Sequence, residues 1–422
     1  MKGSPLENYL QTRAITAPWR IEGCAEANFE GAVVIPALAE EENLFDTVAS
    51  LAVNPTEVLA RFLVLVVVNH RVDAPPADKV NNSRTLARLS ALMPELAHMR
   101  LSWVDAASPG LEMPIKGGGV GLARKIGLDL ALTRIDLSAA RPLLICLDAD
   151  TLVEPSYLPA LVRHFRGTPA GGAAIPFRHQ PGRTREEQSA IVCYELFLRH
   201  YILGLKLAGS PYAFHTVGSA MACTTGAYIT AGGMNRRAAG EDFYFLQHLF
   251  RTSGVARVQG TTVHPSSRPS HRVPFGTGRA VSRKVAGDEG AITFYRPECF
   301  VILARWLGIA GKSLTLPPDN ILRQAGSVSA HLADFLEESR FPEIWAGLRG
   351  NHSASERLLA AFHGWFDGLR TMKLIHHLSA REFPRCGPDE ALPPLLRMAG
   401  IEPPVDPDAY LALIRKQEDD QE

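Results

Sequence analysis

The stretch RFLVLVVVN, residues 61–69, is apolar at every position from Phe62 to Val68. A strand with one face in water alternates apolar and polar residues, whereas a strand covered on both faces reads as a continuous apolar run. A second such run, PLLICL, occupies residues 142–147, and GAVVIP at 31–36 is a shorter β-branched one. These three segments predict buried strands of a parallel sheet.

Helical patterns separate the expected strands, with apolar residues at helical spacing in residues 40–53, 121–133 and 157–165. Shorter strands are expected at 101–105, 172–177 and 254–264. This alternation predicts an α/β fold with a mostly parallel sheet flanked by helices. A long helix is expected at 186–207, and from about residue 291 onward the pattern is helical, which predicts a separate helical region.

Composition narrows the class of protein. The 422 residues are 46% apolar and 21% charged, which is typical of a globular chain. Lysine plus arginine equal aspartate plus glutamate at 44 each, so there is no electrostatic reason to expect nucleic-acid binding. The six cysteines form no CxxC pair, which suits a reducing compartment. No apolar run reaches the roughly 18 to 20 residues of a membrane span. We therefore expect a cytoplasmic protein, with peripheral membrane contact left open.

The segment Asp148-Ala149-Asp150 follows the apolar run 142–147 directly. In open α/β sheets, ligands bind beyond the carboxyl ends of the strands. Residues two apart in an extended chain point to the same side, so both carboxylates can face one hard cation. We expect Mg²⁺ or Mn²⁺ held by Asp148 and Asp150, where the ion can bridge two phosphates. The other interpretation is an acidic pair that caps the next helix.

The segment VVIPALAEEEN, residues 33–43, combines a strand ending in proline with an acidic helix start. Acidic residues in a first turn favour the helix dipole, which explains them without any ligand. The string also resembles the opening of family-2 glycosyltransferases, which typically read VVIPxxNEEExL. This resemblance implies that Pro36, Ala37 and Glu40 hold the base and ribose of a nucleotide.

Two further segments resemble the same family in chain order. The family usually has a DDGSxD-like turn after its second strand, where this chain has NHRVD at 69–73, so Asp73 is the remaining carboxylate implied for the donor. The segment GVGLARKIG at 119–127 resembles G-x-G-x-A-R-N-x-G, which implies that Gly119 and Arg124 contact the diphosphate. Glycines let backbone N–H groups approach an anion, and arginine adds positive charge. In the same comparison Asp148 and Ala149 belong to the donor site.

Gly240-Glu241-Asp242 lies about 90 residues beyond Asp150. It resembles the ED motif of the family, whose aspartate is a general base. A base is needed because an acceptor hydroxyl must lose its proton as it attacks the anomeric carbon. The resemblance therefore implies catalytic roles for Asp242 and Glu241, and an acidic helix start is the alternative.

The last candidates lie at and beyond the end of the strand expected at 254–264. Many GT-A enzymes complete the metal shell with a histidine, and the resemblance implies His264 for this role, with an ordinary loop histidine as the alternative. Residues 266–283 form a basic segment that suits a lid closing over phosphates, or a merely solvated loop. The lid and phosphate candidates are Arg268, Arg272, Gly276 and Gly278.

Together these landmarks imply a GT-A (Rossmann-like) fold and a metal-dependent glycosyltransferase. It would transfer one sugar, with inversion, from a nucleotide-diphosphate sugar to a hydroxyl acceptor, which is a small molecule, a glycan or a lipid-linked group. One alternative is a retaining GT-A transferase of the glucosyl- or mannosyl-phosphoglycerate synthase type. The other is a noncatalytic nucleotide-binding scaffold with the same fold.

The expected organisation has three parts: an N-terminal extension at 1–30, a GT-A catalytic domain at 31–290 and a helical C-terminal region at 291–422. The sequence leaves the role of the helical region open between acceptor binding, formation of a homodimer and support of the catalytic domain.

Overall fold

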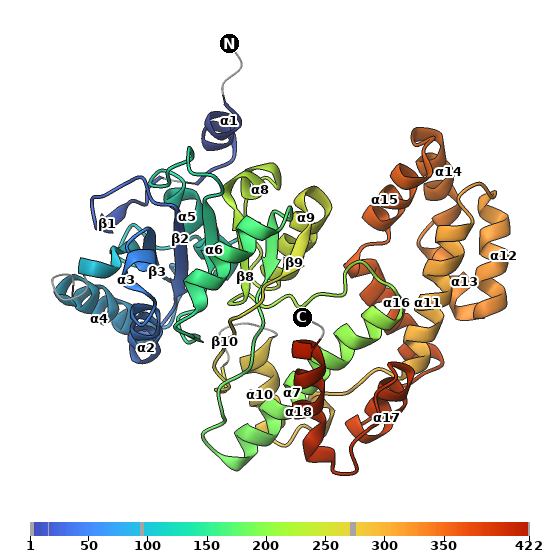
Figure 1. The fold of residues 1–422 in the computed structure, drawn as a ribbon. Coiled ribbons are helices and arrows are strands. Elements are labelled where there is room, and N and C mark those ends of the chain that lie inside the picture. The colour runs from blue at the N-terminus through green and yellow to red at the C-terminus, as the bar shows by residue number, and fades with distance from the viewer. Residues whose placement is uncertain (1–3, 16, 93–96, 271–275, 421–422) are drawn as a thin grey trace. The chain divides into compact units, whose positions relative to one another are not determined.

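The computed structural model describes residues 4–15, 17–92, 97–270 and 276–420, and the chain divides into two compact units (Figure 1). The first unit comprises Met1–Arg183 and Thr216–Arg279, and the second comprises Thr184–His215 and Ala280–Glu422. Compact units and functional domains need not share boundaries, so the domain limits given above remain a prediction.

The first unit is built on an eight-stranded sheet with the order β1-β4-β3-β2-β5-β8-β7-β9. Its strands are β1 (Ile21–Gly23), β2 (Gly31–Ala37), β3 (Phe62–Asn69), β4 (Leu101–Ala106), β5 (Leu143–Cys146), β7 (Gly172–Ala174), β8 (Met221–Thr224) and β9 (Val255–Arg257). Every residue of β2 and β3 is buried, and the two strands pair in parallel from Gly31 opposite Phe62 to Ala37 opposite Val68. The continuous apolar run that predicted a strand covered on both faces is confirmed.

The sheet is mixed, with a parallel core. The pairs β4–β3, β3–β2, β2–β5 and β7–β9 are parallel, whereas β1–β4, β5–β8 and β8–β7 are antiparallel. The sequence did not predict β8, because its small residues lack the β-branched run of the other strands. The strand expected at 254–264 is two strands: β9 joins the large sheet, and β10 (Val263–His264) pairs separately with β6 (Leu152–Val153).

Helices of the first unit surround this sheet (Figure 1). They are α1 (Pro5–Thr12), α2 (Glu41–Ala52), α3 (Thr56–Leu59), α4 (Pro76–Leu92), α5 (Val120–Ala131), α6 (Tyr157–Gly167), α8 (Thr225–Thr230), α9 (Glu241–Ser253) and the 3₁₀ turn η1 (Ala97–Met99). Helix α5 lies directly on the sheet, since a Cβ built on Gly127 would stand 2.4 Å from Val34 Cγ1 and 2.8 Å from Val67 Cγ2. A glycine is required there to bring α5, and the residues at its N-terminus, close to the strand ends.

A buried polar cluster anchors the N-terminal helix α1 to α5. The hydroxyls of Tyr9 and Tyr228 both donate to Asp129 Oδ1 at 2.7 Å, and Lys125 Nζ lies 2.9 Å from Asp129 Oδ2. The backbone N–H of Ile15 donates to the same carboxylate at 2.8 Å. A buried carboxylate needs such partners, so residues 5–15 are fixed to the α/β unit.

The second unit is helical. It contains α7 (Arg185–Leu207), α11 (Pro297–Lys312), α12 (Pro318–Val328), α13 (Ala330–Glu338), α14 (Phe341–Asn351), α15 (Ser355–Trp365), α16 (Gly368–Arg381), α17 (Pro388–Met398), α18 (Tyr410–Asp420), and the turns η2 (Glu289–Ala291) and η3 (Pro407–Ala409). Its core is aromatic, with Trp306 edge-on to Phe341 at 5.3 Å and to Phe362 at 5.7 Å between ring centroids. The predicted helical region is confirmed. The segment 266–283, expected as a loop, instead becomes the helix α10 (Thr277–Val285) after residue 276, and the chain passes between the units within that helix.

Candidate active site

The aspartates at 148 and 150 lie where the sequence predicted, just beyond the carboxyl end of β5. Ala149 between them is buried, and its carbonyl accepts a hydrogen bond of 3.0 Å from the Thr47 hydroxyl of α2. Both aspartate side chains keep contact with solvent, with 36% of Asp148 and 24% of Asp150 exposed. A fixed backbone therefore presents two reachable carboxylates at the edge of the sheet.

Arg124 joins the first aspartate to the ED motif. It extends from α5, and its side chain is 2% exposed. Its Nε donates to Glu241 Oε1 at 3.0 Å, and its Nη2 donates to Asp148 Oδ1. Nη1 is buried without a hydrogen-bond partner among the described residues. Because one guanidinium holds both carboxylates, the segments at 148 and 241 are fixed relative to each other.

Asp242 lies beside this arginine, in the first turn of α9. Burial, and next the negative charge of Glu241, raise the pKa of Asp242 to about 7, although the positive charge of Arg124 opposes the shift. Its Oδ1 accepts a hydrogen bond of 2.7 Å from the backbone N–H of Phe243. A carboxylate that exchanges its proton near neutral pH is suited to general acid–base catalysis.

Gly218 borders both groups. A Cβ built on this residue would stand 2.5 Å from Arg124 Nη2 and 3.6 Å from Asp242 Oδ2. The close approach of the guanidinium therefore leaves no room for a side chain at 218, and the space beside Asp242 remains open. The sequence showed only a run of small residues here and did not identify Gly218.

Arg268 joins the second aspartate to the end of β2. Its Nε and Nη2 lie 3.2 Å and 2.9 Å from Asp150 Oδ2, and Nη2 also donates to Glu40 Oε1. Glu40 is 6% exposed, and its Oε2 accepts a hydrogen bond of 2.9 Å from Asn43. The sequence proposed Arg268 for phosphates and Glu40 for the nucleotide, and the structure brings the two together at Asp150.

The turn after β3 is held by amides rather than by carboxylates. Asn69 Nδ2 donates to the Ala37 carbonyl at 3.2 Å, which joins the ends of β3 and β2 beside Pro36. Asn82 donates to the Asn69 carbonyl at 2.9 Å and accepts from the Ala39 N–H at 2.9 Å. Asn82 belongs to α4, a helix that the sequence did not predict, so its role was missed.

Asp73, the carboxylate expected to survive in this turn, forms an ion pair of 2.9 Å with Arg71, and 38% of its side chain is exposed. Its contact with a donor remains a prediction.

The glycine-rich segment before α5 carries the chain preceding the ED motif. A Cβ on Gly119 would stand 2.8 Å from Ala238 Cα, and one on Gly121 would stand 2.4 Å from the Arg237 carbonyl oxygen. The Gly121 N–H donates to that same oxygen at 3.2 Å. These glycines therefore permit close packing of residues 235–240, and an additional role of Gly119 in binding phosphate remains a prediction.

His264 lies in β10, near Asp150 along the backbone but with other side-chain neighbours. Gln180 Nε2 donates to the carbonyls of Asp150 and His264 at 2.9 Å and 2.7 Å. The imidazole Nδ1 lies 3.1 Å from the Arg178 carbonyl oxygen, and Nε2 lies 3.5 Å from Glu154 Oε1. Within the described ranges, no three histidine, cysteine or acidic side chains gather as a metal site. The role of His264 as third ligand remains a prediction.

The other loop candidates lie beyond Arg268. Arg272 falls outside the described residues. Gly276 has a φ of 103°, which favours glycine, and a Cβ on Gly278 would stand 2.5 Å from Ser270 Cβ. Gly278 therefore permits the first turn of α10 to pack on residue 270, and a function of these residues in a lid remains a prediction.

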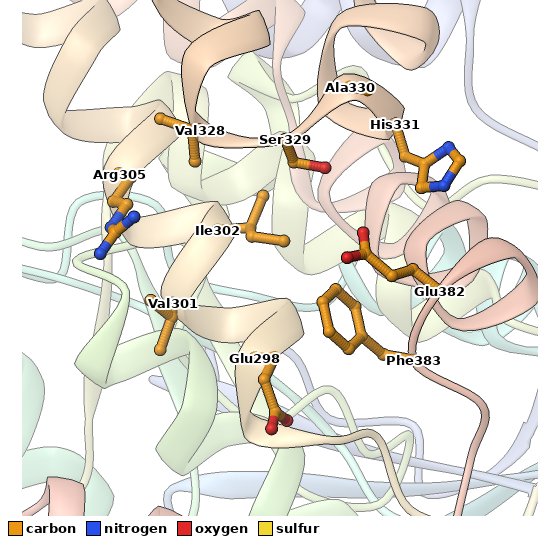
Figure 2. A pocket seen from close by; sticks show the side chains of 10 residues that line it. All are labelled: Glu298, Val301, Ile302, Arg305, Val328, Ser329, Ala330, His331, Glu382 and Phe383. Carbon is orange, nitrogen blue, oxygen red and sulfur yellow. The ribbon is translucent and has the colours of Figure 1, made fainter.

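A second hollow, of about 390 Å³, lies in the helical unit between α11, the α12–α13 junction and the chain after α16 (Figure 2). Its apolar wall includes Val301, Ile302 and Phe383. Arg305 stands at one end of the hollow and Glu382 at the other. None of the predicted site residues lines it, and its charged side chains are exposed.

Comparisons with known proteins give distant similarities. No family model and no curated protein matches the chain. A structure of S. aureus TarS 1–349 in complex with UDP-GlcNAc is 12% identical, with 74% of this chain and 87% of that chain covered and a TM-score of 0.42. The mannosyltransferase PcManGT from Pyrobaculum calidifontis, in complex with GDP-Man and Mn²⁺, is 14% identical over 99% and 93%, with a TM-score of 0.38.

Glucosyl-3-phosphoglycerate synthase from Mycobacterium tuberculosis, in complex with Mn²⁺ and UDP-glucose, is 15% identical over 68% of this chain and 82% of that chain, with a TM-score of 0.34. TM-scores below 0.5 do not establish a function for this chain. Among the helices of the described residues, none has the length and apolar character to cross a membrane.

Proposed function

We propose that this chain is a metal-dependent glycosyltransferase that moves one sugar from a nucleotide-diphosphate sugar to a hydroxyl acceptor, with inversion of the anomeric centre. One observation carries the proposal. Two arginines connect four carboxylates from distant segments: Arg124 holds Asp148 and Glu241, and Arg268 holds Asp150 and Glu40. A packed core has no need of such a polar cluster at a sheet edge, whereas an enzyme acting on phosphates does.

The carboxylates at 148 and 150 fit a hard divalent cation. Mg²⁺ and Mn²⁺ prefer oxygen ligands, and Mg²⁺ is commonly held by one or two carboxylates together with substrate phosphates and water. Asp148 and Asp150 would supply the protein ligands, and the donor diphosphate would supply others. When bound, the ion would offset the negative charge that develops on the departing nucleoside diphosphate.

Arg124 and Asp242 would act on the two sides of the transfer. The Nη1 group of Arg124 is a buried donor without a partner among the described residues, which suits it to an anionic ligand oxygen. Asp242, with its raised pKa, would accept the proton of the attacking hydroxyl. This base is the reason to propose inversion, since a single displacement needs the nucleophile to be deprotonated as it attacks.

The test is release of nucleoside diphosphate from UDP-, GDP-, ADP- and TDP-sugars, with Mn²⁺ or with excess EDTA. We expect at least one donor to be cleaved slowly by water in the presence of metal, and Asp242→Asn to remove this cleavage while leaving donor binding intact. Turnover that is equal with EDTA would reject the metal, and full turnover by Asp242→Asn would reject the base. If an acceptor is found, NMR of the product separates inversion from retention. Donor binding without turnover in any acceptor mixture would favour the scaffold alternative.

A further inference from the structure

Arg268 occupies one of the two carboxylates that the proposed function assigns to a metal. Its guanidinium makes two contacts with Asp150 Oδ2, at 3.2 Å and 2.9 Å. The side chain is 20% exposed, so these contacts are partly shielded from water. A cation cannot take the same lone pairs of Oδ2 while the arginine holds them, since both would have to approach the same oxygen.

Glu40 keeps the arginine in this position. It accepts a hydrogen bond from the same Nη2 that contacts Asp150, and only 8% of its side chain is exposed. A buried carboxylate without a cationic partner is costly, so Glu40 holds the guanidinium strongly. The guanidinium thus lies between two acidic groups in the absence of any ligand.

A diphosphate changes this balance. It carries at least two negative charges, and the planar fork of an arginine matches phosphate oxygens well. A nucleoside diphosphate placed beside Asp150 offers the guanidinium new acceptors, and a metal bound to Asp150 repels it. Each of the two ligands therefore favours the arrangement in which the other binds.

We propose that Arg268 blocks Asp150 from binding metal until the diphosphate of a donor takes over the guanidinium, so that metal and donor bind with positive coupling. This inference rests on the proposed function, and it assigns Arg268 as a positioning residue that sets the order of binding. Coupling between two ligands is reciprocal, so the nucleotide should strengthen metal binding by the same factor as the metal strengthens nucleotide binding.

The experiment titrates Mn²⁺ alone into the full-length protein and follows loss of the electron paramagnetic resonance signal of the free ion. We expect Arg268→Gln to bind Mn²⁺ about tenfold or more tightly than the unchanged protein, within the 5- to 150-fold range typical of such coupling. The double variant Arg268→Gln/Glu40→Gln should show the same gain without leaving an unpaired buried carboxylate. The gain should vanish when Asp150→Asn is added. Arg166→Gln, an exposed arginine at the end of α6, is the matched control and should bind Mn²⁺ as the unchanged protein does.

The second arm measures affinity for UDP and for GDP with no metal and with saturating Mn²⁺. The unchanged protein should show coupling of about tenfold or more for one of the two nucleotides, and both Arg268→Gln proteins should show less. Equal Mn²⁺ affinity in the unchanged and both Arg268→Gln proteins, with undiminished nucleotide coupling, would overturn the inference and leave the proposed function standing. Absence of Mn²⁺ binding in every protein, with and without nucleotide, would overturn both.

Discussion

Replacing Gly218 by alanine tests whether the position of Arg124 is as fixed as the structure indicates. The added methyl group would stand 2.5 Å from Arg124 Nη2, well inside van der Waals contact. The guanidinium is held by Asp148 on one side and by Glu241 on the other, so it cannot withdraw without losing a charged hydrogen bond. Overpacking of a filled site costs about 1 to 3 kcal/mol, and a reacting group displaced by about 1 Å can lose about 100-fold in rate.

We expect Gly218→Ala to remain folded, to lose about 1 to 3 kcal/mol of unfolding free energy in urea, and to lose about 100-fold in donor cleavage. The matched control is Gly226→Ala in α8, where an added Cβ meets nothing within 4 Å. Alanine replaces glycine in a helix there, so stability should rise by roughly 0.5 to 1 kcal/mol and activity should not change. Unchanged stability and full activity in Gly218→Ala would refute the inference that Arg124 is fixed between Asp148 and Glu241.

Three further predictions address proton transfer, acid stability and the N-terminal anchor. Cleavage should rise with pH as Asp242 loses its proton, with a midpoint near the pKa of about 7 or lower once a metal cation is bound nearby, and a flat rate from pH 5 to 8 would contradict this. Burial lowers the pKa of His200 to about 3, so below its ordinary value near 6.5 the unfolded chain takes up a proton that the native state does not, and stability falls by about 1.4 kcal/mol per pH unit between about pH 6.5 and 3. His200→Leu should therefore lose roughly 2 kcal/mol less than the unchanged protein between pH 6.5 and 5 in urea unfolding, and parallel losses would be inconsistent with a neutral buried imidazole. Asp129→Asn leaves Lys125 as a buried cation without its partner, so we expect a loss of about 3 to 5 kcal/mol, whereas a variant as stable as the unchanged protein would mean that the cluster at Tyr9 does not anchor α1.

The sequence predicted the parallel core of the sheet because its signals are local. The runs at 31–36, 61–69 and 142–147 are apolar throughout, and each becomes a strand buried at its core. The short strand β8 and helix α4 were missed, since small residues and a polar helix face carry no comparable pattern. Hydrophobic periodicity reports burial on two faces, and it says little about short antiparallel additions.

The site was partly predictable for a related reason. Asp148, Asp150, Glu40 and Asp242 follow strand or precede helix ends, where ligand-binding residues gather, so their positions could be read from the chain. The partners of the two arginines could not be predicted, because Arg124 lies 117 residues from Glu241 and Arg268 lies 228 from Glu40. Contacts of that range depend on the three-dimensional fold, and no local pattern encodes them.

The most direct test of the central claim is donor binding as a function of metal, measured by thermal unfolding with UDP-, GDP-, ADP- and TDP-sugars, each with and without Mn²⁺. A donor present at about 100 times its dissociation constant should stabilise the native state by about 2.7 kcal/mol. The account predicts such a shift for one base, present with Mn²⁺, much reduced with EDTA, and lost in Asp148→Asn/Asp150→Asn. A shift that is the same with EDTA and in the double variant, or no shift with any donor, would contradict a metal-dependent nucleotide-sugar site at Asp148 and Asp150.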